Sequence, residues 1–129
     1  DYQLMKNINR GKQMRNVWEM SAPLTEEKKF GKHPTQKPVD LLTRIILSST
    51  KENDLVLDPF CGSSTTGIAA ILLKRKYVGM DLEEEYLQLS KKRIEETIKK
   101  SSMFEQKEEI PSEDSKIYKE TLQYNNVLL

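Results

Sequence analysis

Apolar residues recur at helical spacing in three segments of the chain, residues 39–50, 66–75 and 83–100. Each segment is therefore predicted to form an amphipathic helix that buries one stripe. The stripes consist of Val39, Leu42, Ile45 and Ile46, then Ile68, Ala69, Leu72 and Leu73, and finally Tyr86, Leu89, Ile94 and Ile98. The last segment is acidic in its first turn and basic in its last, as the helix dipole favours.

Two short apolar runs, residues 55–58 and 76–81, are typical of β-strands, and each ends on an aspartate. They alternate with the predicted helices in the order helix, strand, helix, strand, helix, which indicates an α/β fold with a parallel sheet. Parallel strands are usually covered on both faces, so residues 55–58 are expected to be buried on both sides. Residues 14–20 have the pattern of a further short strand, with Val17 buried and Trp18 a candidate for burial.

Composition divides the chain into three parts. Residues 1–32 contain the short strand and a polar connector, residues 33–100 contain the α/β unit, and residues 101–129 form a partly loose tail. The chain begins with Asp1 rather than Met, and it offers only two clear parallel strands, whereas sheets usually have roughly four to six. We therefore expect the sequence to be a piece of a longer one, with the sheet completed by a missing part or by another chain.

Charge and cysteine content narrow the class of protein only slightly. Charged residues make up 32% of the chain and the formal net charge is +1, so no strong overall field is implied. Cys61 is the only cysteine, which excludes a disulfide framework and favours a reducing compartment. No apolar run approaches the roughly 20 residues that span a bilayer. We expect a soluble cytoplasmic protein with no membrane contact.

The segment LVLDPFCGSSTTG, residues 55–67, joins a strand-end acid to a turn of small residues. Ligands of open α/β sheets bind beyond the carboxyl ends of the strands, where Asp58 and Asp81 are expected to be neighbours. Asp58 can accept hydrogen bonds from an ammonium group, and Asp81 can accept two from ribose hydroxyls. The small residues 62–64 let the backbone approach a ligand, and the following helix directs N–H groups at a carboxylate. A nucleoside joined to an amino acid would satisfy all of these groups.

Each of these residues also has a purely local explanation. An aspartate at a strand end often caps the next turn, and the hydroxyls of residues 63–65 can cap a helix. His33 is the only histidine, and without a paired acid it is expected to be a loop residue bonded to the backbone. The glycine motifs of nucleotide hydrolases and dehydrogenases are missing, and one cysteine with one histidine is a poor basis for a zinc site.

Three motifs together resemble a known family: HPTQKP (33–38), VLDPFCGSSTTG (56–67) and YVGMD (77–81), followed by Tyr86 and Arg93. They look like the C-terminal part of a bacterial DNA methyltransferase that methylates the exocyclic amine of adenine or cytosine. The resemblance covers residues 14–98. It implies a partial, doubly wound Rossmann-like sheet, S-adenosylmethionine as cofactor, and a restriction-modification role. It also implies that residues 33–100 form the cofactor-binding unit.

The resemblance assigns parts of the cofactor to individual positions. Asp58, Phe60, Gly62 and Ser63 would surround its methionine part. Asp81 would hold the ribose, and Met80 or Leu82 would pack on the adenine. Residues 35–37 would approach the methionine carboxylate. The full set of expected cofactor-binding residues is Thr35, Gln36, Lys37, Asp58, Phe60, Cys61, Gly62, Ser63, Ser64, Thr65, Met80, Asp81 and Leu82. Many relatives have glycine in place of Ser64, so its contact stays open.

The catalytic motif of that family, an Asp, Asn or Ser followed by Pro-Pro and an aromatic residue, has no counterpart here, because the sequence contains no Pro-Pro. We therefore expect no catalytic residue and no methylation activity in this chain alone. DNA would be bound through the full enzyme, and the oligomeric state, a homodimer included, stays open. The alternatives are a non-catalytic cofactor-binding subunit of a split methyltransferase and an enzyme that acts on RNA.

Overall fold

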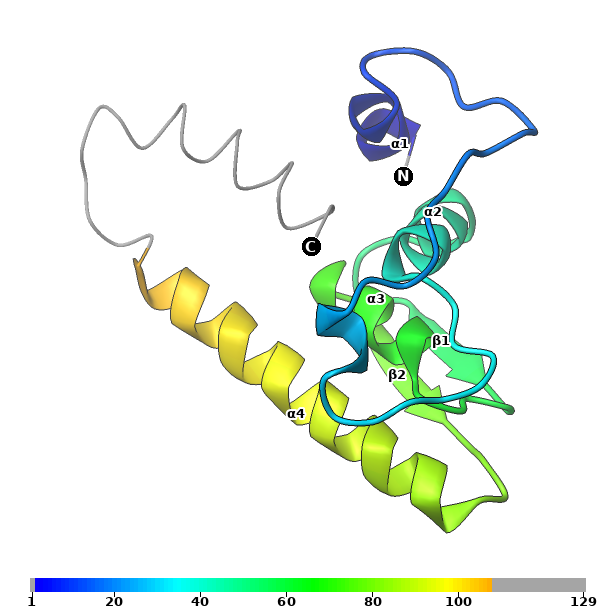
Figure 1. The fold of residues 1–129 in the computed structure, drawn as a ribbon. Helices are drawn as coiled ribbons and strands as arrows, with labels where there is room; N and C mark the ends of the chain where they lie inside the picture. Colours follow the sequence, from blue (N-terminus) through cyan, green and yellow to red (C-terminus); the bar gives the residue numbers. More distant parts are fainter. Residues whose placement is uncertain (1, 108–129) are drawn as a thin grey trace.

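The computed structural model describes the backbone of residues 2–107 and the side chains of residues 2–103 (Figure 1). The predictions for residues 108–129 lie outside the described residues. The elements are α1 (Tyr2–Ile8), the 3-10 helix η1 (Glu26–Lys28), α2 (Val39–Ser49), β1 (Leu55–Asp58), α3 (Thr65–Leu72), β2 (Lys76–Gly79) and α4 (Glu84–Lys107). From residue 39 onward, the predicted order of helices and strands is confirmed.

The two strands pair in parallel as neighbours, as the α/β class requires. Leu55 pairs with Lys76, and Asp58 pairs with Gly79. The connection between the strands runs through α3, which contacts both of them (Figure 1). The carboxyl ends of β1 and β2 therefore meet at one edge of the sheet.

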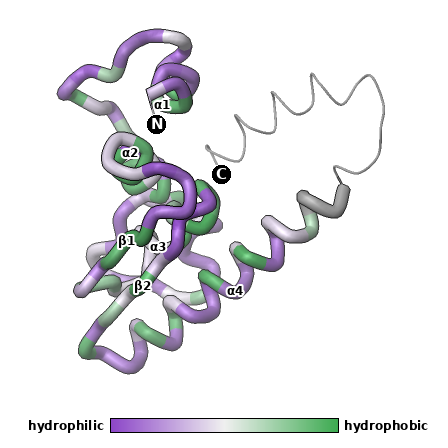
Figure 2. Tube along the Cα trace, turned by 180° about the vertical axis from the view of Figure 1, so that it is seen from behind, coloured by the Kyte–Doolittle hydropathy of each residue, from purple (hydrophilic) through white to green (hydrophobic). Residues whose placement is uncertain are grey.

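A small apolar core lies where α3 packs against α2 and against one face of the strands. Its buried members are Val39, Ile46, Ile68, Ala69 and Ala70, with Val56 and Tyr77 among the partly buried residues packed on them. The close approach of α3 to β2 depends on Gly67, because a Cβ at that position would collide with the Tyr77 ring. Figure 2 shows stretches of apolar colouring in α2, α3 and β1, and mixed colouring along α4.

The second face of the sheet is open within the described residues. Leu55, Leu57 and Val78 are 63%, 57% and 44% exposed. Because side chains alternate along a strand, these three lie together on the face opposite α3. The prediction that residues 55–58 are buried on both sides is therefore wrong for the described residues, since α3 covers only one face.

The predicted strand over residues 14–20 is also wrong, because no strand forms there. Val17 is 76% exposed, and Trp18 is half-buried with its indole N–H donating to the Arg15 carbonyl at 2.6 Å. A strand must pair its backbone groups with a neighbour, and the described sheet ends at β1 and β2.

Helix boundaries differ from the predictions by a few residues. α2 ends at Ser49 and α3 ends at Leu72, whereas α4 continues to Lys107. In α2, Ile45 is 43% exposed, while Thr43 and Leu47 are buried. Among residues 2–107, none of the helices combines the length and the apolar character that crossing a bilayer requires.

Candidate functional site

The two strand-end acids predicted from the sequence lie at the same edge of the sheet. Asp58 is the last residue of β1, and Asp81 comes two residues after the end of β2. Backbone bonds continue beyond the strands: the Met80 N–H donates to the Asp58 carbonyl (2.9 Å), and the Cys61 N–H donates to the Met80 carbonyl (2.8 Å). The two turns that carry the acids are thus bonded to each other.

Asp81 ties these turns together through its carboxylate. One oxygen accepts the Glu83 N–H at 3.0 Å, and the other accepts the Gly62 N–H at 2.8 Å. These backbone donors, that of Glu83 first, hold the pKa of the Asp81 carboxyl below its ordinary value. Each carboxylate oxygen has two acceptor positions, so an ionised Asp81 can still accept hydrogen bonds from a ligand.

Asp58 has a similar double role. One of its oxygens accepts the Phe60 N–H at 3.2 Å, and the other accepts the Thr66 hydroxyl at 2.6 Å. The local explanation, in which strand-end acids cap the following turns, therefore describes real bonds of both Asp58 and Asp81. Because acceptor positions remain on both carboxylates, this capping is compatible with ligand binding.

The side chains of residues 61–65 face the protein interior. Cys61, Ser63, Ser64 and Thr65 are 7%, 3%, 0% and 6% exposed. Ser64 adopts a left-handed conformation with φ of 53° before α3, and its hydroxyl is bonded to Ser90 and to the Tyr77 phenol, the latter at 3.1 Å. Burial raises the pKa of that phenol above its usual range.

An exposed apolar rim stands beside the half-buried carboxylates. Phe60, Met80 and Leu82 are 84%, 49% and 98% exposed. They belong to the turns after β1 and β2, which also carry Asp58 and Asp81. Large apolar side chains of this kind offer a flat aromatic group a surface to pack on.

His33 connects the segment before α2 to the glycine turn. A Cβ on Gly62, whose φ is 50°, would lie 2.8 Å from the His33 Nε2 atom, so glycine is required for this approach. The His33 ring also lies 4.2 Å from the Tyr86 ring, centroid to centroid. Its Nδ1 atom accepts the Thr35 N–H at 3.3 Å, which agrees with the expected loop histidine bonded to backbone.

The other predicted residues of this segment point in different directions. Thr35 and Lys37 are exposed, and the Lys37 ammonium donates to the Thr35 carbonyl at 2.6 Å. Gln36 turns inward, and its amide N–H donates to the Glu27 carbonyl at 2.9 Å. Among the described residues, the buried side-chain oxygen of Gln36 has no hydrogen-bond partner. Thr35 and Lys37 are thus the members of this trio that a ligand can reach.

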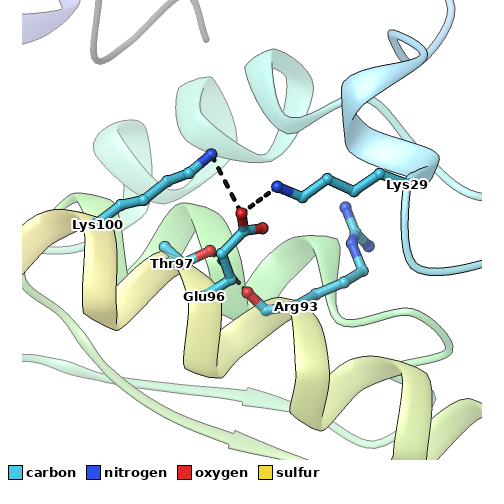
Figure 3. Close-up of polar contacts among 5 residues, drawn as sticks. All are labelled: Lys29, Arg93, Glu96, Thr97 and Lys100. Carbon is cyan, nitrogen blue, oxygen red and sulfur yellow. Dashed lines mark hydrogen bonds and ion pairs between the residues drawn. The ribbon is translucent and has the colours of Figure 1, made fainter.

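An ion-pair cluster anchors the same segment to α4 (Figure 3). Glu96 lies between Lys29, with which it forms a close ion pair, and Lys100, whose Nζ is 3.4 Å away. The hydrogen bond from Lys29 to Glu96 raises the pKa of the Lys29 ammonium. Burial acts to raise the pKa of Glu96, but the two lysines outweigh it, so that pKa lies below its ordinary value.

Several residues that shape the site carried no role in the sequence-based predictions. Glu27 accepts the Leu24 N–H (3.2 Å) and the Val39 N–H (3.1 Å), so its carboxylate caps the start of α2. Thr66 holds Asp58, and Arg93 of α4 reaches the glycine turn. Of these residues, only Arg93 was indicated by the sequence, as part of the resemblance. The others were not, because contacts between distant segments leave no local pattern.

The surroundings of the site contain one cavity and offer no metal centre among the described residues. A cavity of about 320 Å³ is lined in part by Phe30, Lys32 and Lys92, and neither strand-end acid lines it. Among the described residues, no group of three or more His, Cys, Asp or Glu side chains is placed to hold a metal ion.

Comparison with known proteins gives one consistent result. Residues 2–92 match the family described as DNA methylase. The Type II methyltransferase M2.LlaDCHI of Lactococcus lactis subsp. cremoris is 58% identical over 94 residues, which is 73% of this chain and 35% of the relative. The chain thus spans about a third of the length of these curated relatives.

Solved structures show the same likeness. The crystal structure of the M1.HpyAVI–SAM complex is 42% identical, with a TM-score of 0.55, and the match covers 64% of this chain and 42% of that one. The PvuII DNA methyltransferase, described as cytosine-N4-specific, is 25% identical with a TM-score of 0.59 over 95% of this chain and 40% of that one.

Proposed function

The chain belongs to the DNA methylase family, and on that premise we propose that it is the S-adenosylmethionine-binding part of a restriction-modification DNA methyltransferase. The parent enzyme would methylate the exocyclic amine of adenine or of cytosine. One observation carries the proposal: Asp58 at the end of β1 and Asp81 two residues beyond β2 lie at the same edge of the parallel sheet, joined across a glycine turn through the Gly62–Asp81 bond of 2.8 Å. The SAM complex of M1.HpyAVI supports the choice of cofactor.

The two carboxylates fit opposite ends of this donor. Asp81 is ionised at neutral pH, because the ordinary pKa of an aspartate is about 4 and that of Asp81 is lowered further. Its remaining acceptor positions suit two ribose hydroxyls. Asp58 suits the ammonium group of the methionine part, directly or through a water molecule. The exposed rim of Phe60, Met80 and Leu82 suits the adenine ring. The residues present therefore match a nucleoside that carries an amino acid.

The segment before α2 would complete the binding unit, which we assign to residues 33–100. His33 packs on Gly62, so Thr35 and Lys37, which follow it closely in sequence, would lie near the turn. The Lys37 ammonium would bind the methionine carboxylate in place of its own loop carbonyl. The buried side chains of Cys61, Ser63, Ser64 and Thr65 would shape the turn, and the backbone would make the contacts to the donor.

Bound S-adenosylmethionine supplies a methyl group on a positively charged sulfur. An amine nitrogen can attack that methyl group directly and displace the sulfur. The contribution of this chain is alignment: Asp58 and Asp81 fix the two ends of the donor and thereby the direction of its methyl group. The sequence contains no Pro-Pro motif, so groups that grip the target amine would come from elsewhere in the parent enzyme. The chain alone is expected to bind the cofactor weakly and to leave DNA unmethylated.

The partner that completes the enzyme would cover the open sheet face. Leu55, Leu57 and Val78 are exposed there, and a parallel sheet is normally covered on both faces. We assign this role to the remaining part of the parent enzyme, or to a separate chain that carries it. A homodimer formed through this face is the competing arrangement, and its concentration-dependent mass would reveal it. Acting on DNA, the complete enzyme would work in the cytoplasm.

Titration calorimetry of the full chain with S-adenosylmethionine tests the proposal. Wild type should bind saturably, and Asp81→Asn should weaken binding by about tenfold, because a hydrogen bond to a charged group contributes about 1.5–3 kcal/mol. Glu52→Gln removes a charge from an exposed turn and is the matched control, with unchanged affinity expected. Absence of saturable binding in a folded wild type would overturn the proposal, as would wild-type affinity in Asp81→Asn.

A further inference from the structure

The inner face of α4 presents two buried polar residues to the glycine turn. Ser90 and Arg93 are 6% and 4% exposed, and residues three apart lie on the same face of a helix. The Ser90 hydroxyl bonds to the Ser64 hydroxyl. The Arg93 guanidinium donates to the Ser63 carbonyl at 2.5 Å and to the Thr65 hydroxyl at 3.3 Å. One face of α4 thus holds three consecutive residues of the turn.

Arg93 is a buried charge without a carboxylate partner. Within the described residues, no carboxylate comes within ion-pair distance of its guanidinium, which takes no part in the Lys29–Glu96–Lys100 cluster (Figure 3). Burial lowers the pKa of the Arg93 guanidinium, and the more distant charge of Glu27 opposes that effect. The ordinary pKa of an arginine lies far above neutral pH, so Arg93 remains positively charged. Burying an uncompensated charge is costly, which makes this placement informative.

The Ser63 carbonyl that Arg93 binds lies outside the hydrogen-bond ladder of α3. The first backbone bond of that ladder runs from the Ile68 N–H to the Ser64 carbonyl at 3.0 Å. The turn is therefore fixed from two sides, by Asp81 at the Gly62 N–H and by Arg93 at the Ser63 carbonyl. The Ser63 carbonyl is turned inward. Its negative oxygen therefore faces the guanidinium and not the outer surface of the turn.

We infer that Arg93 is a positioning residue for the amino-acid part of the cofactor, an inference that rests on the proposed function. It orients the peptide groups of residues 62–65, and its fixed positive charge behind the turn favours a ligand that brings a carboxylate to it. Arg93 itself does not touch the ligand. The nucleoside part, which Asp81 and the apolar rim would hold, does not depend on it.

Two ligands separate this role from simple support of the fold. S-adenosylmethionine carries the amino-acid part, whereas 5′-deoxy-5′-methylthioadenosine keeps the nucleoside and lacks it. In the full chain, Arg93→Met should weaken binding of S-adenosylmethionine by about tenfold and should leave the affinity for methylthioadenosine within about twofold. Arg93→Lys keeps the charge and one donor, so it should recover part of the loss. Lys91→Met, which removes an exposed charge from α4, is the matched control and should behave as wild type.

The possible results distinguish the two claims. Equal losses for both ligands, or no loss for either, would overturn the role of Arg93 while leaving the proposed function intact. A folded wild type that binds neither ligand would overturn the proposed function and this inference with it. If Arg93→Met fails to fold, Arg93→Lys carries the test, with a smaller loss expected for S-adenosylmethionine alone. An Arg93→Lys variant that binds both ligands as wild type would then contradict the inference.

Discussion

Asp81 illustrates how one side chain can serve the backbone and a ligand at once. Its oxygens accept the N–H groups of Glu83 and Gly62, and these bonds are strongest when the carboxylate is charged. The same charge is what ribose hydroxyls would bind. Turn geometry and ligand binding at this position should therefore respond to the same protonation event.

The pH dependence of the Gly62 amide tests this coupling. The pKa of Asp81 is lower in the folded chain than its ordinary value, which is about 4. Its contribution to stability is therefore fully present above about pH 4 and is lost as the pH falls through the folded pKa. In an NMR titration, the part of the Gly62 amide shift that depends on Asp81, which is the part that Asp81→Asn removes, should change only below about pH 4.

The comparison position for that titration is Asp54, whose carboxylate accepts the Lys51 N–H at 2.7 Å in a separate turn. Asp54→Asn should leave the Gly62 profile unchanged, whereas Asp81→Asn should abolish it. A Gly62 transition centred above about pH 5 that disappears in Asp81→Asn would contradict the assigned bond, because an aspartate with a lowered pKa cannot titrate there.

The chemistry of individual positions was only partly predictable. Asp58 and Asp81 were identified because each ends an apolar run, a pattern that a single strand displays. Ser63, Ser64 and Thr65 are expected to bind the cofactor, and in the structure their side chains are buried. Their orientation depends on Tyr77, Ser90 and Arg93, which lie 13 to 30 residues away in sequence. No local pattern encodes such contacts.

The start of α2 shows how one segment can complete another. Pro38 at its N-cap makes no side-chain bond to the helix, and Glu27 of η1 supplies the missing acceptor for the Val39 N–H at 3.1 Å. A carboxylate is favourable at a helix N-terminus for both hydrogen bonding and the helix dipole. This contact also fixes the path of residues 28–38, which carry His33 to the glycine turn.

Glu27→Gln is expected to destabilise the chain by about 1 kcal/mol, a typical value for loss of a helix cap. The midpoint of urea unfolding should fall, while the slope of the transition should stay unchanged because the same surface is exposed on unfolding. Glu26→Gln in the same 3-10 helix is the control and should have little effect, since its carboxylate caps no described helix. Equal midpoints for Glu27→Gln and wild type would show that the cap is unimportant.

Elements with a strong local pattern were predicted well, and those that depend on a partner were not. The strand over residues 55–58 and the helices after it follow from hydrophobic spacing alone. Residues 14–20 also contain apolar residues, but they pair with neither β1 nor β2. The prediction that Leu55 and Leu57 are buried was wrong for a related reason. What covers a sheet face is a property of the whole protein, not of the strand.

The open sheet face is the main feature in which this chain differs from a domain that folds without a partner. It exposes Leu55, Leu57 and Val78, and the chain spans about a third of the length of its curated relatives. An apolar strand face that is exposed in one part of a protein commonly marks an interaction site. The proposed partner segment would bury it.

Leu57→Lys separates the stability of the chain from its association. Leu57 is already 57% exposed, so this change should alter the free energy of unfolding by no more than about 0.5 kcal/mol. Binding of the remaining part of the parent enzyme should nevertheless be lost, because a lysine at that interface would have to be buried without a partner. Co-purification and sedimentation of the two parts would measure this.

Val56→Lys is the contrasting variant on the covered face, where Val56 packs against the core. It should destabilise the chain itself. If Leu57→Lys unfolds the chain as strongly as Val56→Lys, the face is not open in solution. If Leu57→Lys associates as wild type, the proposed partner binds elsewhere.

The central claim is that the turns beyond β1 and β2 bind S-adenosylmethionine, and an NMR titration of the full chain with this cofactor tests it most directly. We predict saturable shifts of the Gly62, Ser63 and Leu82 amides, with one dissociation constant for all three and a dissociation constant about tenfold larger in Asp81→Asn. Saturable shifts confined to other regions, such as the cavity beside Phe30 and Lys92, would contradict it.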